Sequence, residues 1–403
     1  MADTSSETAG RNIQELREAH DPERMANPHP HLAELRARGP VIDDNELSAQ
    51  IVTRSAVEAA LRDHRTFSSA SGWSVMAAKR PLIPLQVDPP LHKEYRKLLD
   101  PLFSPRKMAE WIDPVTELVN RRIDGFIDSG ECIFDEEIGV PIPSEVFLTV
   151  VGFPLSDLDY FLELKDGLLR PGHREGLEPG DAAGRQQIQE ATAEKVYEYF
   201  LPAIHAARRD PGDDLIGGFV TAEVDGRGLS DEDILDICFL MLAAGLDTVT
   251  DSLSLFFAHL AQRPASRKAI VADPEVIPNA VEELLRFESP VPGVTPRLVI
   301  ADTEIEGCPI PAGKIASINL ASANTDPEFL PDADQVRFDR QENPHLAFGG
   351  GVHRCLGSHL ARQELRIVLR EWHRRIPEYS LVPGTELRWP PGLRHVENVH
   401  LTW

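Results

Sequence analysis

The sequence is poor in cysteine, with four thiols scattered over 403 residues. This spacing excludes a disulfide framework and favours a reducing compartment. A long apolar run is also missing, because the strongest one, residues 237–246, lies between Asp236 and Asp247 and is too short to span a bilayer. The first residues, Met-Ala-Asp-Thr-Ser-Ser-Glu, contain neither the basic nor the apolar block of a signal peptide. We therefore expect a cytoplasmic protein without a membrane anchor, and a buried helix at 237–246.

Positive charge is in deficit, since 41 basic residues stand against 65 acidic ones and the net charge is −24. This balance argues against nucleic acid as a partner. The basic residues are nevertheless clustered, with six arginines between His353 and Arg375 against only Glu364 and Glu371. A second cluster comprises Lys93, Arg96, Lys97, Arg106 and Lys107. Each cluster fits a solvated helix face as well as it fits a docking surface.

The periodicity of apolar residues predicts a mostly α-helical fold with a minor β region. No linker or repeat divides the chain, so residues 31–403 are expected to form one domain after a polar segment over residues 1–30. Helices are expected from Ser104–Pro105 to about Gly130, from Asp231 to about Gln262, and from Leu356 to about Arg375. Short strands are expected at Val41–Asp43, Gln50–Thr53, Leu298–Ala301, Ile315–Asn319 and near the C-terminus. Residues 172–184 and 326–345 are expected to be irregular.

A glycine-rich loop places one cysteine where a thiolate is favoured. From Phe348 to Gly357 the sequence reads Phe-Gly-Gly-Gly-Val-His-Arg-Cys-Leu-Gly, with Cys355 directly after two potential cations. A lone buried cysteine is usually an inert hydrophobe, but nearby cations, backbone N–H groups and a helix start stabilise the ionised sulfur that binds metals. Glycines such as Gly351 let the backbone approach something flat or large. Haem iron is the favoured partner, because a thiolate ligand assists O–O bond cleavage.

Two other interpretations of the loop compete with haem. A phosphate-binding loop needs Gly-x-Gly-x-x-Gly after a strand, and counted from Gly349 the third glycine position is occupied by Arg354. A zinc site needs further Cys or His residues at ligand spacing, whereas the other three cysteines are isolated.

The middle of the expected helix at 231–262 contains an acid beside an alcohol. Ala243, Ala244 and Gly245 leave space beside the helix. Thr248 can turn its hydroxyl toward a backbone carbonyl and open the helical hydrogen bonds, so that Asp247 and Thr248 can relay protons. The alternative is close helix packing with Asp247 in a salt bridge. A haem thiolate elsewhere in the chain favours the relay.

Further charged residues suit an anionic cofactor or a buried ion cluster. His92 and Arg96 share one face of a helix that follows two prolines, and haem propionates need such cationic donors. Arg297 and His353 are further candidates. Glu283 and Arg286 lie on one helix face, and Arg340 can complete a structural ion triad with them.

The acid-alcohol helix, the Glu-x-x-Arg pair and the cysteine loop occur in this order, and together they resemble the cytochrome P450 family from Pro30 onward. The loop Phe348-x-x-Gly351-x-x-x-Cys355-x-Gly357 is highly specific to that family. The segment 244–248 is similar to the family's oxygen-activation motif, and the Glu-x-x-Arg pair with the later arginine is similar to its structural triad. The length and the Gly-Leu-Asp-Thr wording look most like the soluble bacterial camphor-hydroxylase branch.

This resemblance implies the P450 fold and a thiolate-ligated haem b, iron protoporphyrin IX, with Cys355 as the axial ligand of the iron. It implies proton delivery by Asp247 and Thr248. The other residues implied to bind the cofactor are His92, Arg96, Arg297, His353, Gly245, Phe348, Gly351 and Gly357. The resemblance also implies a substrate pocket formed by Trp73, Leu85, Leu240, Ala243, Ala244, Val294 and Leu393.

The implied activity is that of a monooxygenase that uses O2 to hydroxylate a hydrophobic small molecule, such as a terpenoid, steroid, fatty acid or aromatic compound. The chain lacks a Rossmann fingerprint and clustered cysteines, so it has no flavin or iron–sulfur module of its own. We therefore expect a monomer that receives two electrons from an acidic ferredoxin served by a reductase. A peroxygenase and a haem sensor are the alternatives. The acid-alcohol pair argues against the first, and Thr248 would be dispensable in the second.

Overall fold

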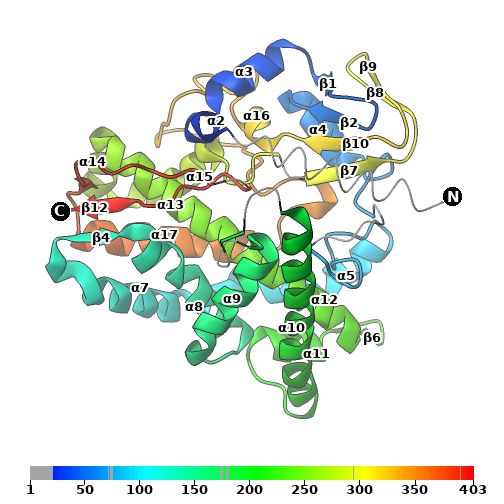
Figure 1. Ribbon diagram of the computed structural model, residues 1–403, viewed down its shortest axis with the longest axis horizontal. Coiled ribbons are helices and arrows are strands. Elements are labelled where there is room, and N and C mark those ends of the chain that lie inside the picture. Colours follow the sequence, from blue (N-terminus) through cyan, green and yellow to red (C-terminus); the bar gives the residue numbers. More distant parts are fainter. Residues whose placement is uncertain are drawn as a thin grey trace. The chain divides into compact units, whose positions relative to one another are not determined.

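Helices dominate the computed structural model, and its strands are short (Figure 1). The fold class predicted from the sequence is confirmed. The structure describes residues 21–403 except 71, 73–75, 173–175, 178–180, 294 and 391. Within these ranges, no helix combines the length and apolarity that crossing a membrane requires. The chain divides into unit 1, residues 1–71, 119–139 and 248–403, and unit 2, residues 72–118 and 140–247. That residues 31–403 form one domain stays a prediction.

A five-stranded sheet in unit 1 has the order β1-β2-β10-β7-β3. Its strands are β1 (Val41–Asp43), β2 (Ser48–Ile51), β3 (Phe67–Ser68), β7 (Thr295–Val299) and β10 (Ile315–Ile318). β2 and β10 pair in parallel, with Ala316 opposite Ala49, and the other pairs are antiparallel. Helix α4 (Arg54–Arg62) packs its buried Val57 into one core cluster with Phe67 and Ile318. This core holds α4 in place, and the cysteine loop lies against the backbone of Leu61 on that helix.

A second core in unit 1 is aromatic. Phe134 stacks on Phe257 at 3.9 Å between ring centroids, and Trp372 meets Phe257 edge-on at 5.0 Å. These rings join helices α13 (Asp247–Gln262) and α17 (Ser358–Arg375) to the start of the π-helical turn η3 (Asp135–Gly139). The remaining helices of unit 1 are α2 (Pro22–Ala26), α3 (His29–Ala37), α14 (Pro264–Ala272), α15 (Ile277–Glu288) and α16 (Leu320–Asn324). Its remaining strands are β4 (Glu131–Ile133), β8 (Thr303–Ile305), β9 (Cys308–Ile310), β11 (Ser380–Leu381) and β12 (His400–Thr402).

Unit 2 is built around the 28-residue helix α10 (Ala182–Arg209), which packs against its neighbours α9, α11 and α12. The approach of α9 to α10 is so close that a Cβ on Gly167 would lie 2.3 Å from Thr192 Oγ1. The helices of the unit are α5 (Leu91–Leu99), α6 (Pro105–Ala109), α8 (Pro141–Val151), α9 (Leu158–Leu169), α11 (Leu215–Thr221) and α12 (Asp231–Gly245). Strands β5 (Glu223–Val224) and β6 (Arg227–Gly228) form a hairpin, and α7 (Ile112–Phe126) contains residues of both units.

Most predicted helix starts are correct, but two helices are shorter than expected. Ser230 caps α12 through a reciprocal capping box with Asp233, as the sequence suggests. The helix then ends at Gly245, and α13 begins after Leu246. Ser104 Oγ accepts the N–H of Lys107 and so caps α6, which stops after five residues before α7 begins. The segment expected to be polar up to residue 30 contains α2 and the start of α3, while residues 1–20 lie outside the described ranges.

Candidate active site

The cysteine loop is fixed in unit 1 by its backbone. The N–H of Cys355 donates to the carbonyl of Phe348 at 2.9 Å, which closes the loop. Gly351 has a φ of +64°, and a Cβ there would lie 2.0 Å from the carbonyl oxygen of Leu61. Only glycine fits at this position, because both the conformation and the close backbone exclude a side chain. Gly357 follows with open space around its Cα and precedes α17.

The thiol of this loop differs from the other three. All four cysteines lie in the described ranges, and Cys355 alone is exposed, while Cys132 and Cys238 are buried and Cys308 is intermediate. Burial raises the pKa of Cys238 well above its usual range and that of Cys132 to about 12, so both stay protonated and inert. Only Cys355 is placed to bind a large partner.

The interruption between α12 and α13 lies at the acid-alcohol pair. Leu246 lies between the two helices, with φ −90° and ψ −64°. Ala244 and Gly245 are exposed, and a Cβ on Gly245 would meet only Phe147, at 3.9 Å. The small residues therefore leave open space beside the helix, as their sequence suggested. On the other side of the break, the hydroxyl of Ser252 donates to the carbonyl of Thr248 at 2.7 Å.

Asp247 is held by two cations of unit 2. Its carboxylate lies 2.9 Å from Nζ of Lys165 and 3.4 Å from Nη2 of Arg170, and its side chain is only 5% exposed. The salt bridge that the sequence left as an alternative is therefore present. Neither partner was identified from the sequence. A lysine flanked by buried apolar residues at helical spacing, such as Phe161 and Leu168 on α9, was the available signal.

The candidate propionate partners are distributed over both units. In unit 2, His92 is buried on α5, and Nε of Arg96 donates to Asp100 at 2.5 Å one turn later. In unit 1, Arg297 is 5% exposed on β7 and donates to the carbonyl of Pro296 at 2.9 Å. His353 is half-buried in the short helix just before Cys355.

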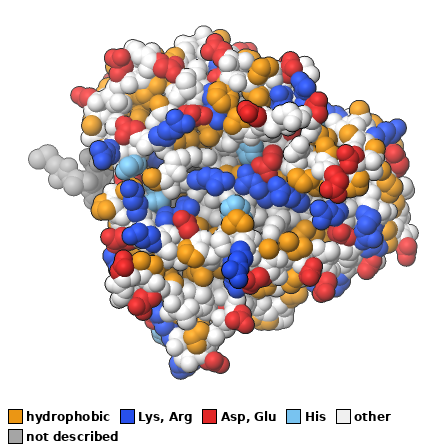
Figure 2. Space-filling view, turned by 180° about the vertical axis from the view of Figure 1, so that it is seen from behind, with side chains coloured by type: hydrophobic (Ala, Val, Ile, Leu, Met, Phe, Trp, Pro, Cys, Tyr) orange, Lys and Arg blue, Asp and Glu red, His pale blue; other side chains and the backbone are white. Residues whose placement is uncertain are grey.

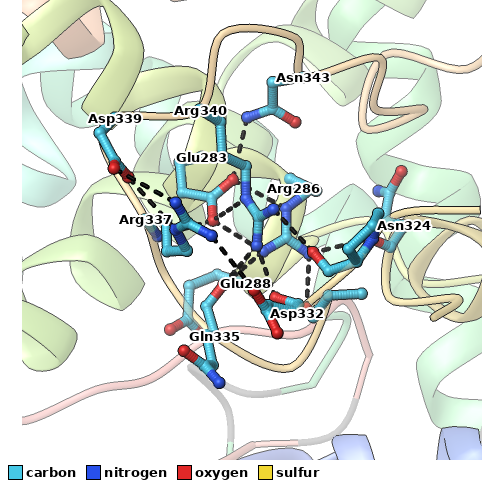
Figure 3. Close-up of polar contacts among 12 residues, drawn as sticks. Glu283, Arg286, Glu288, Asn324, Asp332, Gln335, Arg337, Asp339, Arg340 and Asn343 are labelled. Atoms are coloured by element: carbon cyan, nitrogen blue, oxygen red, sulfur yellow. Dashed lines mark hydrogen bonds and ion pairs between the residues drawn. The ribbon is translucent and has the colours of Figure 1, made fainter.

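The structure brings the predicted ion triad together inside unit 1 (Figure 3). Arg286 donates twice to Glu283, both times at 2.8 Å, and Nε of Arg340 donates to the same carboxylate at 3.0 Å. Burial raises the pKa of Glu283, but the Arg286 guanidinium and the other donors outweigh it and hold the pKa below its usual value. The sequence did not reveal two further donors, the Asn343 amide and the backbone N–H of Arg337.

This ion cluster shapes the irregular segment that leads to the cysteine loop. Arg286 also donates to the carbonyls of Asn324, Ala333 and Gln335, and Arg340 donates to those of Pro331 and Asp332. A chain without helix or strand hydrogen bonds thus obtains them from two guanidinium groups. These contacts suit the structural role expected for the triad, which stays a prediction.

The predicted substrate residues are only partly described. Trp73 and Val294 lie outside the described residues. Leu85, Leu240 and Leu393 are half-buried, Ala243 is buried and Ala244 is exposed. A shallow groove at the β1–β2 turn is lined by Asp43, Asn45, Glu46, Leu47 and residues 311–314, none of which belongs to this set. We give that groove no weight as a substrate site, because it is open and carries no feature of the predicted chemistry.

The residues present fit a thiolate-bound cofactor better than a metal cluster. One exposed thiol follows a loop in which glycine is obligatory. In the part of the chain that the structure describes, no three His, Cys, Asp or Glu side chains converge as metal ligands do. The exposed sulfur of Cys355 suits a cofactor that brings its own remaining ligands.

Comparison with known proteins agrees with this donor set. The family model described as cytochrome P450 matches residues 184–374. The steroid C26-monooxygenase of Mycolicibacterium smegmatis is 33% identical, over 89% of this chain and 88% of that protein. The chain belongs to the cytochrome P450 family. Mycinamicin IV hydroxylase/epoxidase of Micromonospora griseorubida is 32% identical to this P450, over 77% of this chain and 76% of the relative's own sequence. The crystal structure of CYP109E1 from Bacillus megaterium with corticosterone superposes with a TM-score of 0.84 at 27% identity, covering 94% of this chain and 99% of the other.

The family fixes the general chemistry of this P450. It is a cytochrome P450 monooxygenase, and its cofactor is a thiolate-ligated haem b. The exposed thiol and the obligatory glycine of the loop are consistent with that cofactor. Its substrate, its electron donor and the roles of individual side chains are matters for proposal.

Proposed function

We propose that this P450 hydroxylates a bulky hydrophobic molecule, with steroids as the first candidates and terpenoids, fatty acids and aromatic compounds after them. The observation that carries the proposal is its similarity to a steroid monooxygenase over most of both chains, supported by a steroid-bound structural relative. The similar mycinamicin IV hydroxylase/epoxidase supports hydroxylation as the reaction. The small side chains of Ala243 and Ala244 suit a bulky substrate.

The bound haem supplies O2 activation and C–H oxidation, and we assign its sulfur ligand to Cys355. His92, Arg96, Arg297 and His353 are proposed to hold the propionates, which their cationic character supports. Thr248 is proposed to position a proton donor, with Asp247 beside it. Because Lys165 and Arg170 pair with Asp247, its carboxylate is stabilised as the anion and does not give up a proton from that arrangement. We therefore propose that Thr248 acts directly in proton delivery. Asp247 takes part only when it leaves its ion pairs with Lys165 and Arg170.

A titration of the purified, haem-loaded protein tests the substrate class. Steroids, terpenoids, fatty acids and aromatic compounds are added separately, and the shift of haem absorption from low-spin to high-spin is recorded. We expect the shift with steroids, followed by a hydroxylated product when O2, a ferredoxin and its reductase are supplied. A shift with fatty acids alone would reject the steroid proposal. Efficient product formation from peroxide without donor proteins would indicate a peroxygenase, and binding without turnover would indicate a sensor.

We further propose that electrons arrive from an acidic ferredoxin and that the protein acts as a monomer. The α17 arginines are less available than their number suggests, because Arg362 and Arg366 pair with Glu282, and Arg375 pairs with Asp124. Glu364, one of the two acids on the same helix, does not offset the arginine charges. Burial raises its pKa well above the usual range and keeps the carboxyl group neutral.

The α5–α6 cluster in unit 2 offers better contacts for a ferredoxin. Lys93, Lys97 and Arg106 are exposed, and the described residues place no carboxylate within ion-pair distance of them. Their neighbours Arg96 and Lys107 instead pair with Asp100 and Glu110. Exposed cations without an internal partner are the ones that attract an acidic protein most strongly.

A further inference from the structure

Glu282 on α15 organises a cluster of four side chains in unit 1, which we call the Glu282 cluster: Glu282, His345, Arg362 and Arg366. Nε of Arg362 lies 2.8 and 3.0 Å from the two oxygens of Glu282, and Nη2 donates at 2.8 Å. Arg366 adds a contact at 3.3 Å and Nε2 of His345 one at 2.9 Å. A carboxylate that receives this many donors is held firmly in one orientation.

The state of His345 follows from its two contacts. Its Nδ1 accepts the backbone N–H of Ala347 at 3.1 Å, so the ring proton lies on Nε2 and is donated to Glu282. Burial acts to raise the pKa of Glu282, but the hydrogen bonds from His345 and Arg362 outweigh it and lower the pKa to about 2. The Glu282 carboxylate therefore stays ionised near neutral pH.

The cluster reaches the cysteine loop through Phe348. The guanidinium of Arg362 lies over the Phe348 ring, with 4.3 Å from Cζ to the ring centroid. Phe348 is also the residue whose carbonyl accepts the Cys355 N–H. Arg362 further donates to the carbonyl of Ser358, the first residue of α17, at 3.3 Å. One planar group thus touches both ends of the segment that contains the sulfur ligand.

We propose that Glu282 and Arg362 are positioning residues for the sulfur ligand: Glu282 holds the Arg362 guanidinium over the Phe348 ring, and this fixes the carbonyl that restrains the Cys355 backbone. The planar guanidinium is required, because an ammonium group neither stacks on a ring over its full face nor binds a carboxylate with two parallel hydrogen bonds. This assignment goes beyond substrate and electron donor, and it does not depend on either. It also gives Arg362 an internal role in place of ferredoxin docking.

The chain contains a matched control on the same helix. Glu288 also receives a histidine and an arginine, His259 at 2.6 Å and Arg394 at 2.6 Å, and it is buried. Glu282→Gln and Glu288→Gln therefore each remove one ionised carboxylate from a His–Arg pair. Only the first touches the residue that covers Phe348, so any effect common to both reports general destabilisation.

The experiment measures hydrogen exchange in peptides covering residues 346–357, together with the absorption of the reduced carbon-monoxide complex. In Glu282→Gln we expect the Cys355 amide to exchange on the order of tenfold faster, since its hydrogen bond opens more often. We also expect part of the sulfur-type absorption to convert to the imidazole type. Glu288→Gln should change neither signal.

Arg362→Lys provides the second variant, because it retains the charge but loses the planar group that stacks on Phe348 and binds Glu282 through parallel hydrogen bonds. Arg362→Lys should reproduce both signals expected of Glu282→Gln. It also tests the proposal if Glu282→Gln does not fold. Arg366→Lys, which alters a longer contact away from the ring, should not. The proposal is overturned if Glu282→Gln and Arg362→Lys keep the parent exchange rate and absorption, or if Glu288→Gln changes both to the same degree.

Discussion

At the scale of single residues, backbone geometry decides which positions of the cysteine loop tolerate a side chain. Gly349 and Gly351 both have positive φ, +66° and +64°. Nothing lies within 4 Å of a Cβ on Gly349, whereas one on Gly351 would overlap the carbonyl of Leu61. The two glycines look alike in the sequence. The structure shows that a side chain at Gly349 would meet backbone strain alone, whereas one at Gly351 would also clash with a neighbouring carbonyl.

Gly349→Ala and Gly351→Ala are therefore expected to differ. The first should cost about 1–3 kcal/mol of backbone strain and leave the loop in place. The second adds a clash with backbone that cannot move without disturbing α4, so the loop must shift. We predict that Gly351→Ala lowers the haem content of the purified protein severalfold, measured as haem absorption per chain. Equal haem content in the two variants would contradict this prediction.

Thr248 provides a second test at this scale. If its hydroxyl positions the proton donor, Thr248→Ala should divert reducing equivalents to hydrogen peroxide and lower the product formed per electron pair by roughly a hundredfold, at the lower end of the range that positioned acid–base groups contribute. Thr250→Ala, two residues further along α13 and buried, is the control and should keep normal coupling. Coupling that survives in Thr248→Ala would contradict the role of Thr248 in proton delivery.

At the scale of secondary-structure elements, the sequence predicted where helices begin better than where they are interrupted. The caps at Ser104 and Ser230 are local, because a side chain bonds a backbone N–H three residues on, and both are present. The small residues before Leu246 suggested a local weakening of the helix. They did not predict that the chain would form two separate helices there. The partners of Asp247 on α9 could not be predicted, since they depend on tertiary packing some 80 residues away in the chain.

The end of α17 contains a histidine whose protonation should be visible in stability. Nδ1 of His373 is bound to the carbonyl of Leu369 at 2.7 Å, and Nε2 lies 3.2 Å from the hydroxyl of Tyr379. This arrangement suits the neutral ring, which donates from Nδ1 and accepts at Nε2. Burial lowers the pKa of His373 to about 4. The unfolded chain, with a pKa near 6.5, therefore binds a proton first as the pH falls.

The sign of the pH effect follows from this difference. The stability that neutral His373 contributes is fully present above about pH 6.5 and is lost as the pH falls toward 4, by about 3 kcal/mol in all. His373→Gln should be less stable at pH 8 yet show a flatter decline between pH 6.5 and 4, measured by urea unfolding of the intact protein. A decline as steep as that of the parent would contradict the assignment.

At the scale of the whole molecule, net charge and local charge act in opposite directions on an acidic partner. The protein carries −24 charges, and Figure 2 shows acidic and basic side chains exposed together on one face. A ferredoxin of the same sign is repelled at long range, even if Lys93, Lys97 and Arg106 attract it at contact. The total charge and the basic clusters can both be read from the sequence, but the ion pairs inside unit 1 can be seen only in three dimensions.

The salt dependence of electron transfer should reveal this competition. At 0.01 M ionic strength the screening length is about 30 Å, so repulsion by the whole protein dominates. At about 0.1 M it falls to about 10 Å, which removes the long-range repulsion and leaves the local attraction largely intact. At 1 M, with about 3 Å, the local pairs are screened as well. We therefore predict that the rate of reduction by an acidic ferredoxin passes through a maximum near 0.1 M salt.

Charge reversal on α5 and α6 should abolish that maximum. In Lys97→Glu and Arg106→Glu the local attraction becomes repulsion, so the reduction rate should be lower at every salt concentration and should rise steadily with salt. Lys268→Glu, an exposed lysine on α14 for which the described residues provide no ion pair, makes the same change in net charge and should keep the maximum. A parent rate that falls steadily from the lowest salt would show that local attraction dominates at all distances. A rate independent of salt in all four proteins would remove the charged ferredoxin from the proposal.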